Sequence, residues 1–573
     1  MKPSIARTIL ISVSWIALAG CSTKHYRKSA DQEVARIITQ KTPSVPNMDP
    51  RFTIEQTNAF SLEGLPVVTK VEDFLGSEAD RELGARVISL EKALEIGVRH
   101  SRIYQSRKEQ LYLQALGLTL ARHQFAPIFS GRGQTQYEVN TEEVRFVIDP
   151  LTGEPTTLTR HDAQLVEQHR IRANGSVGVN KLLRAGGRVS AALTTDFLRY
   201  LTGDPRTFTS SQVGATLLQP LWRGAGFKVA MENLTQAERS LLYALRNFTL
   251  YRKSFSVQIA VAYYGVLQNR DSARNEYLGF QISQKSAERE RALAKEGRTK
   301  QAELARLEQQ VLTTESRWIN AIRSYQQRLD DLKIQLGLST DASVILDDTE
   351  LRQLKILDPQ VSLDDAVKVA LATRLDLYNV REQHDDTARG IYMAANRLKT
   401  QVDLVANAGI ASKPETGTGF PVPDIQRYHW NAGLNVDLPL ERKQERNAYR
   451  AALIDHEQSS RALEQSQDQI KLQIRSDLRN LESARRDYEI SKIAIELSER
   501  RLEEQSLLAE LGRGLAEAQV AAQTDLTRSR DALTASVVGH TIARLQFWND
   551  MGILYIKDNG QWEEVSNAKS INN

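Results

Sequence analysis

Few residue groups in this chain have the types and spacing that catalysis or nucleotide binding requires. The segments Gly224-Ala225-Gly226 and Gly131-Arg132-Gly133 are rich in glycine, as phosphate-binding loops are, but neither completes a G-x-G-x-x-G pattern and no Walker A motif is present. His456-Glu457 begins the pattern of a zinc protease, but Ser460 occupies the position of the second histidine ligand. The sequence therefore predicts a protein that is not an enzyme and that uses no cofactor and no metal.

Cys21, the only cysteine, marks the end of an N-terminal segment that differs from the rest of the chain. Lys2 and Arg7 lie before a short apolar stretch, residues 9–19. Small residues end this stretch, as is typical of a secretory signal peptide. Leu18-Ala19-Gly20-Cys21 resembles the lipobox of bacterial lipoproteins. The resemblance implies removal of residues 1–20, diacylation of the Cys21 thiol and acylation of its new amino group.

The residue after Cys21 bears on where such a lipoprotein resides. By resemblance to bacterial sorting rules, Ser22 in place of Asp favours the outer membrane. We therefore expect a protein that is lipid-anchored in the cell outer membrane and has a large periplasmic portion. The alternative is an ordinary signal peptide with an incidental cysteine. A lone cysteine also leaves no internal disulfide, so packing must stabilise the fold.

The composition is that of a folded protein of several domains. The chain has 573 residues, of which 41% are hydrophobic and 25% charged. Beyond residue 20 no apolar run approaches the roughly 20 residues of a membrane helix, so entry into a bilayer requires strands. The formal charge of +4 falls to +2 once Lys2 and Arg7 are removed, and no basic block with interleaved aromatic residues suggests nucleic acid as a partner.

Local patterns divide the chain into polar, strand-like and helical parts. Ser89 is a candidate N-cap for a helix that runs to about Gln124. Segments with period-two alternation and turn signals between them predict strands at 128–137, 171–182, 188–197, 212–218, 403–410 and 430–438. Alternation with small and polar partners is typical of transmembrane barrel strands, although a soluble sheet would look similar.

The helical parts are unusually long. No proline occurs from Leu221 to Asp358, and neither glycine nor proline occurs from Glu441 to Leu511. The second run spans about 105 Å as a single helix. Its apolar residues follow coiled-coil spacing, as in Ile474, Leu481 and Tyr488. A charged helix of this length must lie against equally long partners.

The chain also contains an internal duplication. Residues 87–95, VISLEKALE, reappear as residues 360–368, QVSLDDAVK. Each copy is followed by strand-like sequence, a proline, a long helical run and a Gly-Arg break. The first strand region is longer than the second by about 54 residues, which loops or an additional hairpin absorb.

This order of segments resembles the outer membrane efflux protein family, the TolC-like proteins, in its lipoprotein subtype. The resemblance covers about residues 87–556 and rests on the duplicated order and spacing, with the local segments 219–226, 438–450 and 545–554 in support. It implies a mixed α/β, mainly α fold: a duplicated strand-plus-long-helix unit that forms a trimeric transmembrane β-barrel, continued by a periplasmic α-helical coiled-coil barrel.

The same resemblance implies function and partners. Each chain of a homotrimer gives at least four strands to one shared barrel in outer membrane lipid. The trimer acts as a passive channel of an efflux or secretion system, and it accepts substrate from an inner membrane pump through a periplasmic adaptor, the membrane fusion protein. The alternative from another class is a coiled-coil periplasmic lipoprotein without a pore, which acts as a structural or adaptor component.

Two Gly-Arg breaks mark the tips at which helical hairpins reverse, and the resemblance implies that these tips contact the adaptor. The tip residues are Gly297, Arg298, Gly512 and Arg513. The alternative is that glycine merely makes the turn, since it permits a left-handed residue.

Acidic residues shortly after the second tip ring the closed pore mouth in many relatives. This sequence departs from that pattern, because Ala518 and Ala521 occupy the corresponding positions. Glu303, at the equivalent place after the first tip, and Glu517 are therefore the candidates for a pore gate. A solvated helix face is the competing interpretation.

These patterns predict five segments. They are a lipoprotein signal peptide at 1–20, a tether and periplasmic wrapping segment at 21–86, a first TolC-like repeat at 87–358 with strands at about 126–219 and a tip near 297, a second repeat at 359–556 with strands at about 402–438 and a tip near 512, and a tail at 557–573. The sequence leaves open the transported substrate, the pump and adaptor, and whether residues 138–208 enlarge the barrel or stand outside it.

Overall fold

A computed structural model of the chain describes residues 22–49, 52–55, 62–70, 72–144, 146–148, 155–157, 164–202, 206–416, 419–511 and 514–563. The chain forms two compact units. Unit 1 comprises Met1–Ala115, Leu241–Gln383 and Ser460–Asn573, and unit 2 comprises Leu116–Ser240 and His384–Ser459. The predicted Cys21, Gly512 and Arg513 lie outside the described residues.

Unit 1 is built from helices and one small sheet. Its elements, some of which continue into unit 2, are α2 (Thr23–Lys41), two 3₁₀ segments (Thr42–Ser44 and Asp73–Arg81), β1 (Arg86–Ile88), α3 (Leu90–His100), α4 (Arg102–His123), α6 (Glu232–Lys295), α7 (Gln301–Leu336), β8 (Val344–Leu346), α8 (Thr349–Gln353), α9 (Leu363–Thr373), α10 (Leu375–Arg397), α11 (Lys443–Glu510) and α12 (Ala516–Asp550). Strands β1 and β8 pair in parallel. No helix in the described part of the chain combines the length and apolar character that crossing a membrane needs.

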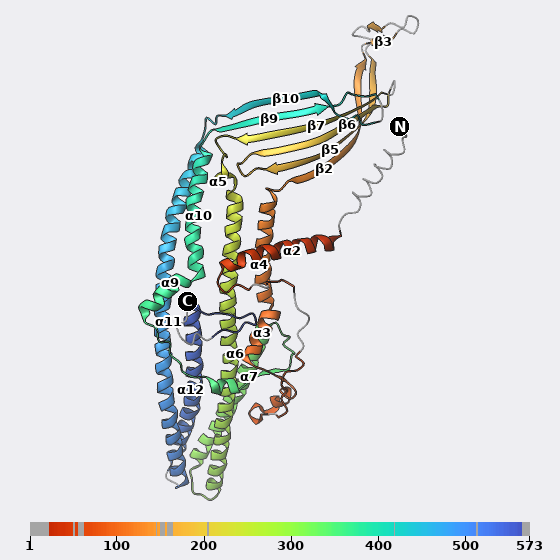
Figure 1. Cartoon of the computed structure of the whole chain (residues 1–573). Helices are drawn as coiled ribbons and strands as arrows, with labels where there is room; N and C mark the ends of the chain where they lie inside the picture. Colours follow the sequence, from red (N-terminus) through yellow and green to blue (C-terminus); the bar gives the residue numbers. More distant parts are fainter. Residues whose placement is uncertain are drawn as a thin grey trace. The chain divides into compact units, whose positions relative to one another are not determined.

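Unit 2 contains the large sheet, whose strands lie side by side in Figure 1. Its elements are β2 (Ile128–Val144), β3 (Phe146–Ile148), β4 (Pro155–Thr157), β5 (Gln164–Leu182), β6 (Arg188–Tyr200), β7 (Thr207–Pro220), α5 (Phe227–Ala230), β9 (Gln401–Ala411) and β10 (Asp424–Asp437). Six strands form one antiparallel sheet in the order β10-β9-β7-β6-β5-β2, and β3 pairs with β4 in a separate hairpin. Each strand candidate of the sequence analysis overlaps a strand of this sheet.

The prediction of one continuous helix from Ser89 to about Gln124 is wrong in one respect. Ser89 does cap α3, since its side chain accepts a hydrogen bond from the Lys92 backbone N–H. The helix then breaks at Ser101, whose ψ of 123° is extended, and α4 begins at the next residue. Gly337, which ends α7 with φ +81°, approaches the backbone at His100 so closely that a Cβ there would lie 2.1 Å from the His100 carbonyl oxygen. This close approach depends on a tertiary contact, which the sequence pattern does not contain.

The N-terminal segment is anchored to the helices of unit 1. Helix α2, which the sequence analysis did not foresee, buries Val34, Ile37 and Ile38. Further along, Glu82 accepts hydrogen bonds from the Arg270 guanidinium (2.8 Å) and the Tyr325 hydroxyl (2.7 Å), and all three residues are buried. A buried carboxylate with these partners ties the segment to both α6 and α7.

Helix α11 buries very little of its surface within the chain. It runs without interruption over 68 residues, of which only Ile470, Ile474, Asp477 and Leu481 are buried. Helix α12 contacts α11, as in the Ser498–Ser529 hydrogen bond and the Arg501–Asp525 ion pair. Most helices of globular proteins bury a continuous apolar stripe, whereas this helix leaves most of its surface at least partly exposed.

We predict that Gly337→Ala destabilises unit 1 by at least about 2 kcal/mol, because L residues are strained at positive φ and the new Cβ meets backbone. Gly539→Ala is the matched control, since Gly539 lies inside α12 with open space around it, and the added methyl group should be neutral or stabilising. Thermal unfolding of the two variants followed by circular dichroism tests this. Equal melting temperatures would contradict the close approach at His100.

Candidate membrane-facing sheet and helix tips

The six-stranded sheet separates apolar from polar side chains with a period of two. On β9, Val402, Leu404, Ala406, Ala408 and Ile410 share one face. The register places each of them opposite an apolar residue of β10, in the order Val436, Leu434, Ala432, Trp430 and Tyr428. The neighbouring strands therefore present one common apolar face.

The same apolar face continues across the other four strands. The register carries the row through Ala408 to Ala215 on β7, Ala191 on β6, Val179 on β5 and Phe129 on β2. On β5 the apolar face runs from Ile171 to Val179, on β6 from Val189 to Phe197, and on β2 from Phe129 to Val139, whereas β7 contributes only Val213, Ala215 and Leu217. Like the bands of β9 and β10, the bands of β5 and β6 span nine residues, the length of a tilted transmembrane strand.

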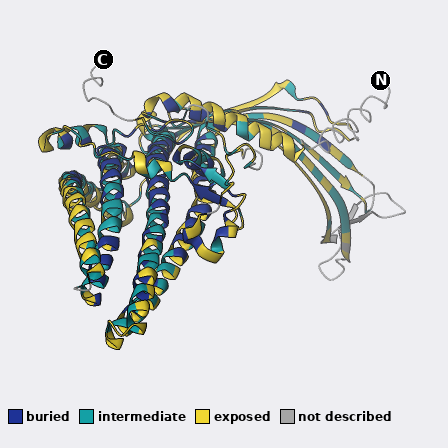
Figure 2. Ribbon diagram, turned by 90° about the horizontal axis from the view of Figure 1, so that it is seen from below, coloured by how far each residue is buried: buried dark blue, intermediate teal, exposed yellow. Residues whose placement is uncertain are grey.

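Within the described residues of unit 2, no other segment covers this apolar face. Large side chains on it are exposed, among them Phe129 (78%), Val177 (64%), Tyr428 (70%) and Trp430 (72%). Figure 2 shows the strands mostly in the colours of exposed and half-buried residues. A soluble protein rarely leaves a contiguous apolar patch of this size in water, so the face is built to meet another apolar phase.

The opposite face of the sheet is mainly polar. One row across it consists of Asn431, Asn407, Thr216, Ser190 and Asn180. Other residues of this face carry charges or amides, namely Arg132, Gln134, Gln136, Arg172, Asn174, Asp196, Gln212, Asp403, His429, Asn435 and Asp437. An apolar face and a hydrated face on alternate residues are the pattern of a strand wall between lipid and water.

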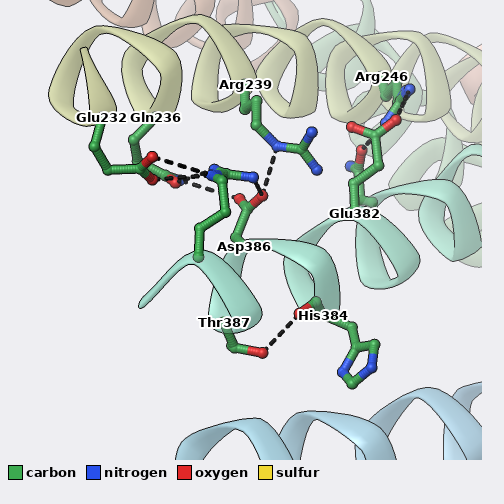
Figure 3. Close-up of polar contacts among 10 residues, drawn as sticks. Glu232, Gln236, Arg239, Arg246, Glu382, His384, Asp386 and Thr387 are labelled. Atoms are coloured by element: carbon green, nitrogen blue, oxygen red, sulfur yellow. Dashed lines mark hydrogen bonds and ion pairs between the residues drawn. The ribbon is translucent and has the colours of Figure 1, made fainter. Parts of the chain in front are cut away.

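A cluster of charged side chains joins α6 and α10, the two long helices that are connected to the central strands β7 and β9. Helix α6 follows β7, and α10 precedes β9. In unit 2, the Asp386 carboxylate of α10 forms ion pairs with Arg239 of α6 at 2.5 Å and with Arg389 at 2.9 Å (Figure 3). Arg389 also forms an ion pair with Glu232 at 3.0 Å. Gln236 bonds to both Asp386 and Arg389, so the carboxylates and guanidinium groups are shared within one network.

The residues that resembled enzyme motifs have structural roles. Gly224 and Gly226 adopt positive φ in the turn between β7 and α5, and the Gly224 N–H donates to the Asn396 side chain at 2.9 Å. His456 stacks on His384, with ring centroids 4.5 Å apart, and contacts the Thr387 hydroxyl. Within the described residues, no group of three His, Cys, Asp or Glu side chains is placed to hold a metal ion.

The first tip closes with a defined helix-terminating turn. The Arg298 N–H donates to the Leu293 carbonyl and the Gly297 N–H donates to the Ala294 carbonyl, and Gly297 has φ +69°. This pair of bonds is the Schellman motif, which requires a left-handed residue at the glycine position. Arg298 itself remains exposed beside Glu296. Sequence reasoning had identified both residues, because Gly-Arg interrupts a long helical run.

The two gate candidates begin the helices that return from the tips. Glu303 lies in the first turn of α7 and Glu517 in the first turn of α12, where the helix dipole stabilises a carboxylate. Glu517 is exposed and contacts Arg306 of α7 at 3.2 Å. Near it, Ala516 packs with Ala287 and Leu307 in a small core that joins α6, α7 and α12.

The second tip has one glycine whose role the sequence analysis did not specify. A Cβ at Gly514 would lie 2.7 Å from the Ala509 backbone nitrogen, so the chain passes too close to α11 for any other residue. Its neighbours Gly512 and Arg513 are outside the described residues, as noted above.

Comparison with solved structures identifies this architecture. The chain matches the outer membrane protein VceC of Vibrio cholerae at 13% sequence identity and a TM-score of 0.58, over 81% of this chain and 96% of that chain. It matches the CmeC outer membrane channel of Campylobacter jejuni at 11% identity and a TM-score of 0.57, over 91% and 96%. The MtrE outer membrane channel of Neisseria gonorrhoeae, in its open state, matches at 11% identity and a TM-score of 0.54, over 81% and 89%.

The chain has the fold of bacterial outer membrane channels. The predicted TolC-like fold, mainly helical with a sheet, is thereby confirmed. No protein-family model and no curated protein matches the sequence. In the described part of the chain the sheet of this fold is open, with β10 at one edge and β2 at the other, so one copy does not close a barrel.

We expect Asp386→Ala to destabilise unit 2 by about 2–4 kcal/mol, since it leaves Arg239 and Arg389 without their shared carboxylate in a site where Asp386 is 12% exposed. Glu482→Ala, which removes an exposed carboxylate on α11, is the control and should change stability by less than about 0.5 kcal/mol. Denaturant titration measures both, and equal effects would contradict a cooperative network.

Unit 1 contains a pair of carboxyl groups that share one environment. The side chain of Gln473 on α11 donates to Asp477 at 3.0 Å and to Asp550 of α12 at 3.1 Å. Burial, together with the neighbouring Asp550 carboxylate, raises the pKa of Asp477 to about 7. Near neutral pH this carboxyl group therefore keeps its proton in about half of the molecules.

A raised pKa makes the folded state less stable as the pH rises. The stabilisation by protonated Asp477 is complete below its usual pKa of about 4 and is lost as the pH increases through about 7, by at most about 1.4 kcal/mol per pH unit. Melting temperatures from pH 4 to pH 8 should therefore fall in the natural chain and vary less in Asp477→Asn. Asp468→Asn, which removes an exposed carboxylate of α11, should keep the full pH dependence. A flat profile in the natural chain would contradict the raised pKa.

Proposed function

We propose that the protein is a passive outer membrane channel of an efflux or secretion system. The observation that carries this proposal is the two-faced sheet, since an exposed apolar band of nine residues on successive strands fits lipid and a polar opposite face fits a water-filled lumen. Its fold is that of the solved outer membrane channels.

In this proposal three copies share one barrel. An open sheet edge in lipid leaves backbone N–H and C=O groups unsatisfied, so β2 of one copy pairs with β10 of the next. Exposed apolar residues on the helices support the same assembly. Ile490, Ile493 and Leu497 follow a helical stripe on α11 and are 58–64% exposed, and long helices of neighbouring copies would cover them.

The helices of the proposed trimer form a periplasmic barrel, and Cys21 carries the lipid anchor. The two repeats arise from a duplicated strand-plus-long-helix unit. The tips at Gly297, Arg298, Gly512 and Arg513 contact a periplasmic adaptor that links the channel to an inner membrane pump, and Glu303 and Glu517 ring the closed mouth. The Schellman turn at Gly297 supports this arrangement, because it holds Arg298 exposed at the end of a rigid hairpin.

The first experiment is the native mass of protein extracted in detergent from the outer membrane fraction, followed by conductance in planar bilayers. Three copies of a 64.5 kDa chain weigh roughly 190 kDa. A trimer that conducts ions supports the channel. A monomer without conductance overturns it in favour of a periplasmic coiled-coil lipoprotein without a pore.

A pair of adjacent substitutions tests the lipid-facing band itself. Leu434→Arg places a charge on the apolar face of β10 and should destabilise the vesicle-inserted protein by about 2–3 kcal/mol. Asn435→Arg places the same charge on the polar face of the same strand and should cost less than about 0.5 kcal/mol. Urea unfolding in phosphatidylcholine vesicles measures both. Equal losses would contradict contact between this face and lipid.

A further inference from the structure

The segment 138–208 contributes strands to the wall of the sheet. All of β5 and all of β6 lie in it, and they occupy the interior of the strand order, between β2 and β7. Their apolar bands, Ile171–Val179 and Val189–Phe197, have the same nine-residue length as the band of β9. Charged residues then occupy the next positions of the same face, Lys181 on β5 and Arg199 on β6, as at the boundary of a membrane.

The register shows that these bands form one inclined belt. From Ile410, at one end of the β9 band, pairing leads through Val213, Leu193 and Val177 to Gly131 on β2. The β2 band ends at Val139, eight residues further along that strand. The β10 band is level with the β9 band, since Tyr428 pairs with Ile410. From β10 to β2 the end of the belt therefore shifts by eight residues over five strand-to-strand steps.

This shift corresponds to a definite strand tilt. Eight residues rise about 26 Å along a strand, and five steps cover about 24 Å across the sheet. A belt with this mean slope is level with the membrane when the strands tilt by about 47°, close to the 35–45° of transmembrane barrels.

We propose that all six strands of each copy cross the membrane, so that the trimer closes a widened barrel of eighteen strands for hydrophilic solutes of large cross-section. This inference rests on the proposed function. An even number of strands makes the free edges β10 and β2 run in opposite directions, so rotationally related copies join by antiparallel pairing as the rest of the sheet does.

Six strands per copy change the width of the lumen. At a tilt of about 40° and a strand spacing of about 4.8 Å, eighteen strands enclose a circle about 36 Å across between backbones, against about 24 Å for the twelve strands that four per copy would provide. The row of Gly178, Ala192, Gly214 and Gly409 on the polar face keeps side chains short at one level of the wall. The rest of that face is rich in neutral amides and hydroxyls, which hydrogen-bond to polar solutes of either charge.

The test adds one cysteine at a time to the full chain, which keeps Cys21, and reconstitutes the detergent-extracted assembly into phosphatidylcholine vesicles. Val177→Cys and Leu193→Cys place a fluorophore on the apolar face of β5 and β6, and Ser176→Cys and Thr194→Cys place it on the polar face. Ala406→Cys and Asn407→Cys are the matched pair on β9. The natural chain, whose only cysteine is Cys21, is the control for background labelling.

Quenching distinguishes the outcomes. Spin-labelled acyl chains should quench the probe at positions 177, 193 and 406 at least twofold more than at 176, 194 and 407, and aqueous iodide should show the reverse preference. If lipid quenches the probe at position 406 but not at 177 and 193, the proposal of a widened barrel is wrong, while the proposed channel function is retained. If lipid quenches none of the three, the proposed function itself is wrong.

Discussion

The backbone hydrogen bonds at the two edges of the large sheet are the constraint on which the rest of the structure depends. Within the described chain β9, β7, β6 and β5 are paired on both sides, whereas β10 and β2 are each paired on one side only. The sheet carries an exposed apolar face, and in a hydrocarbon environment an unpaired edge costs several kcal/mol for each group. In the proposed trimer further copies of the chain pair with these edges, and a shared barrel results.

The helices of one copy also lack contacts, but the missing interaction is of a different kind. Helix α11 keeps apolar residues such as Ile490 and Ile493 exposed while it buries only four side chains. The energy missing here is hydrophobic burial, at roughly 25 cal/mol per Å² of apolar surface. A strand edge needs a partner with matching hydrogen bonds, but a helix stripe needs only an apolar surface of matching length. In the proposed trimer, the neighbouring copies supply both.

Charged networks then hold the individual helices in register inside each unit. Asp386 binds two arginines in unit 2, and Glu82 binds Arg270 and Tyr325 in unit 1. In both places a carboxylate removed from solvent accepts several hydrogen bonds, which makes the arrangement specific as well as stable. The Asp477 and Asp550 pair differs, because two like charges share the site and burial makes one of them retain its proton.

The sequence by itself determined the features that depend on periodicity and on turn chemistry. Alternation with period two located the strands, the absence of glycine and proline located α11, and Gly297 marked the reversal between α6 and α7. These signals are local, because side-chain direction repeats every two residues in a strand and a left-handed turn needs glycine. Ser89 was recognised as a cap for the same reason.

Only the tertiary structure decided how distant segments combine. The break at Ser101 lies where Gly337 approaches the backbone of His100, the Asp386 network joins residues about 150 positions apart, and the shift of the apolar belt from strand to strand exists only once all the strands are paired. The sequence left the role of residues 138–208 open, because alternation shows that a strand has two faces but not which strand lies beside it. Register is a property of the assembled sheet, and it is register that places β5 and β6 in the wall.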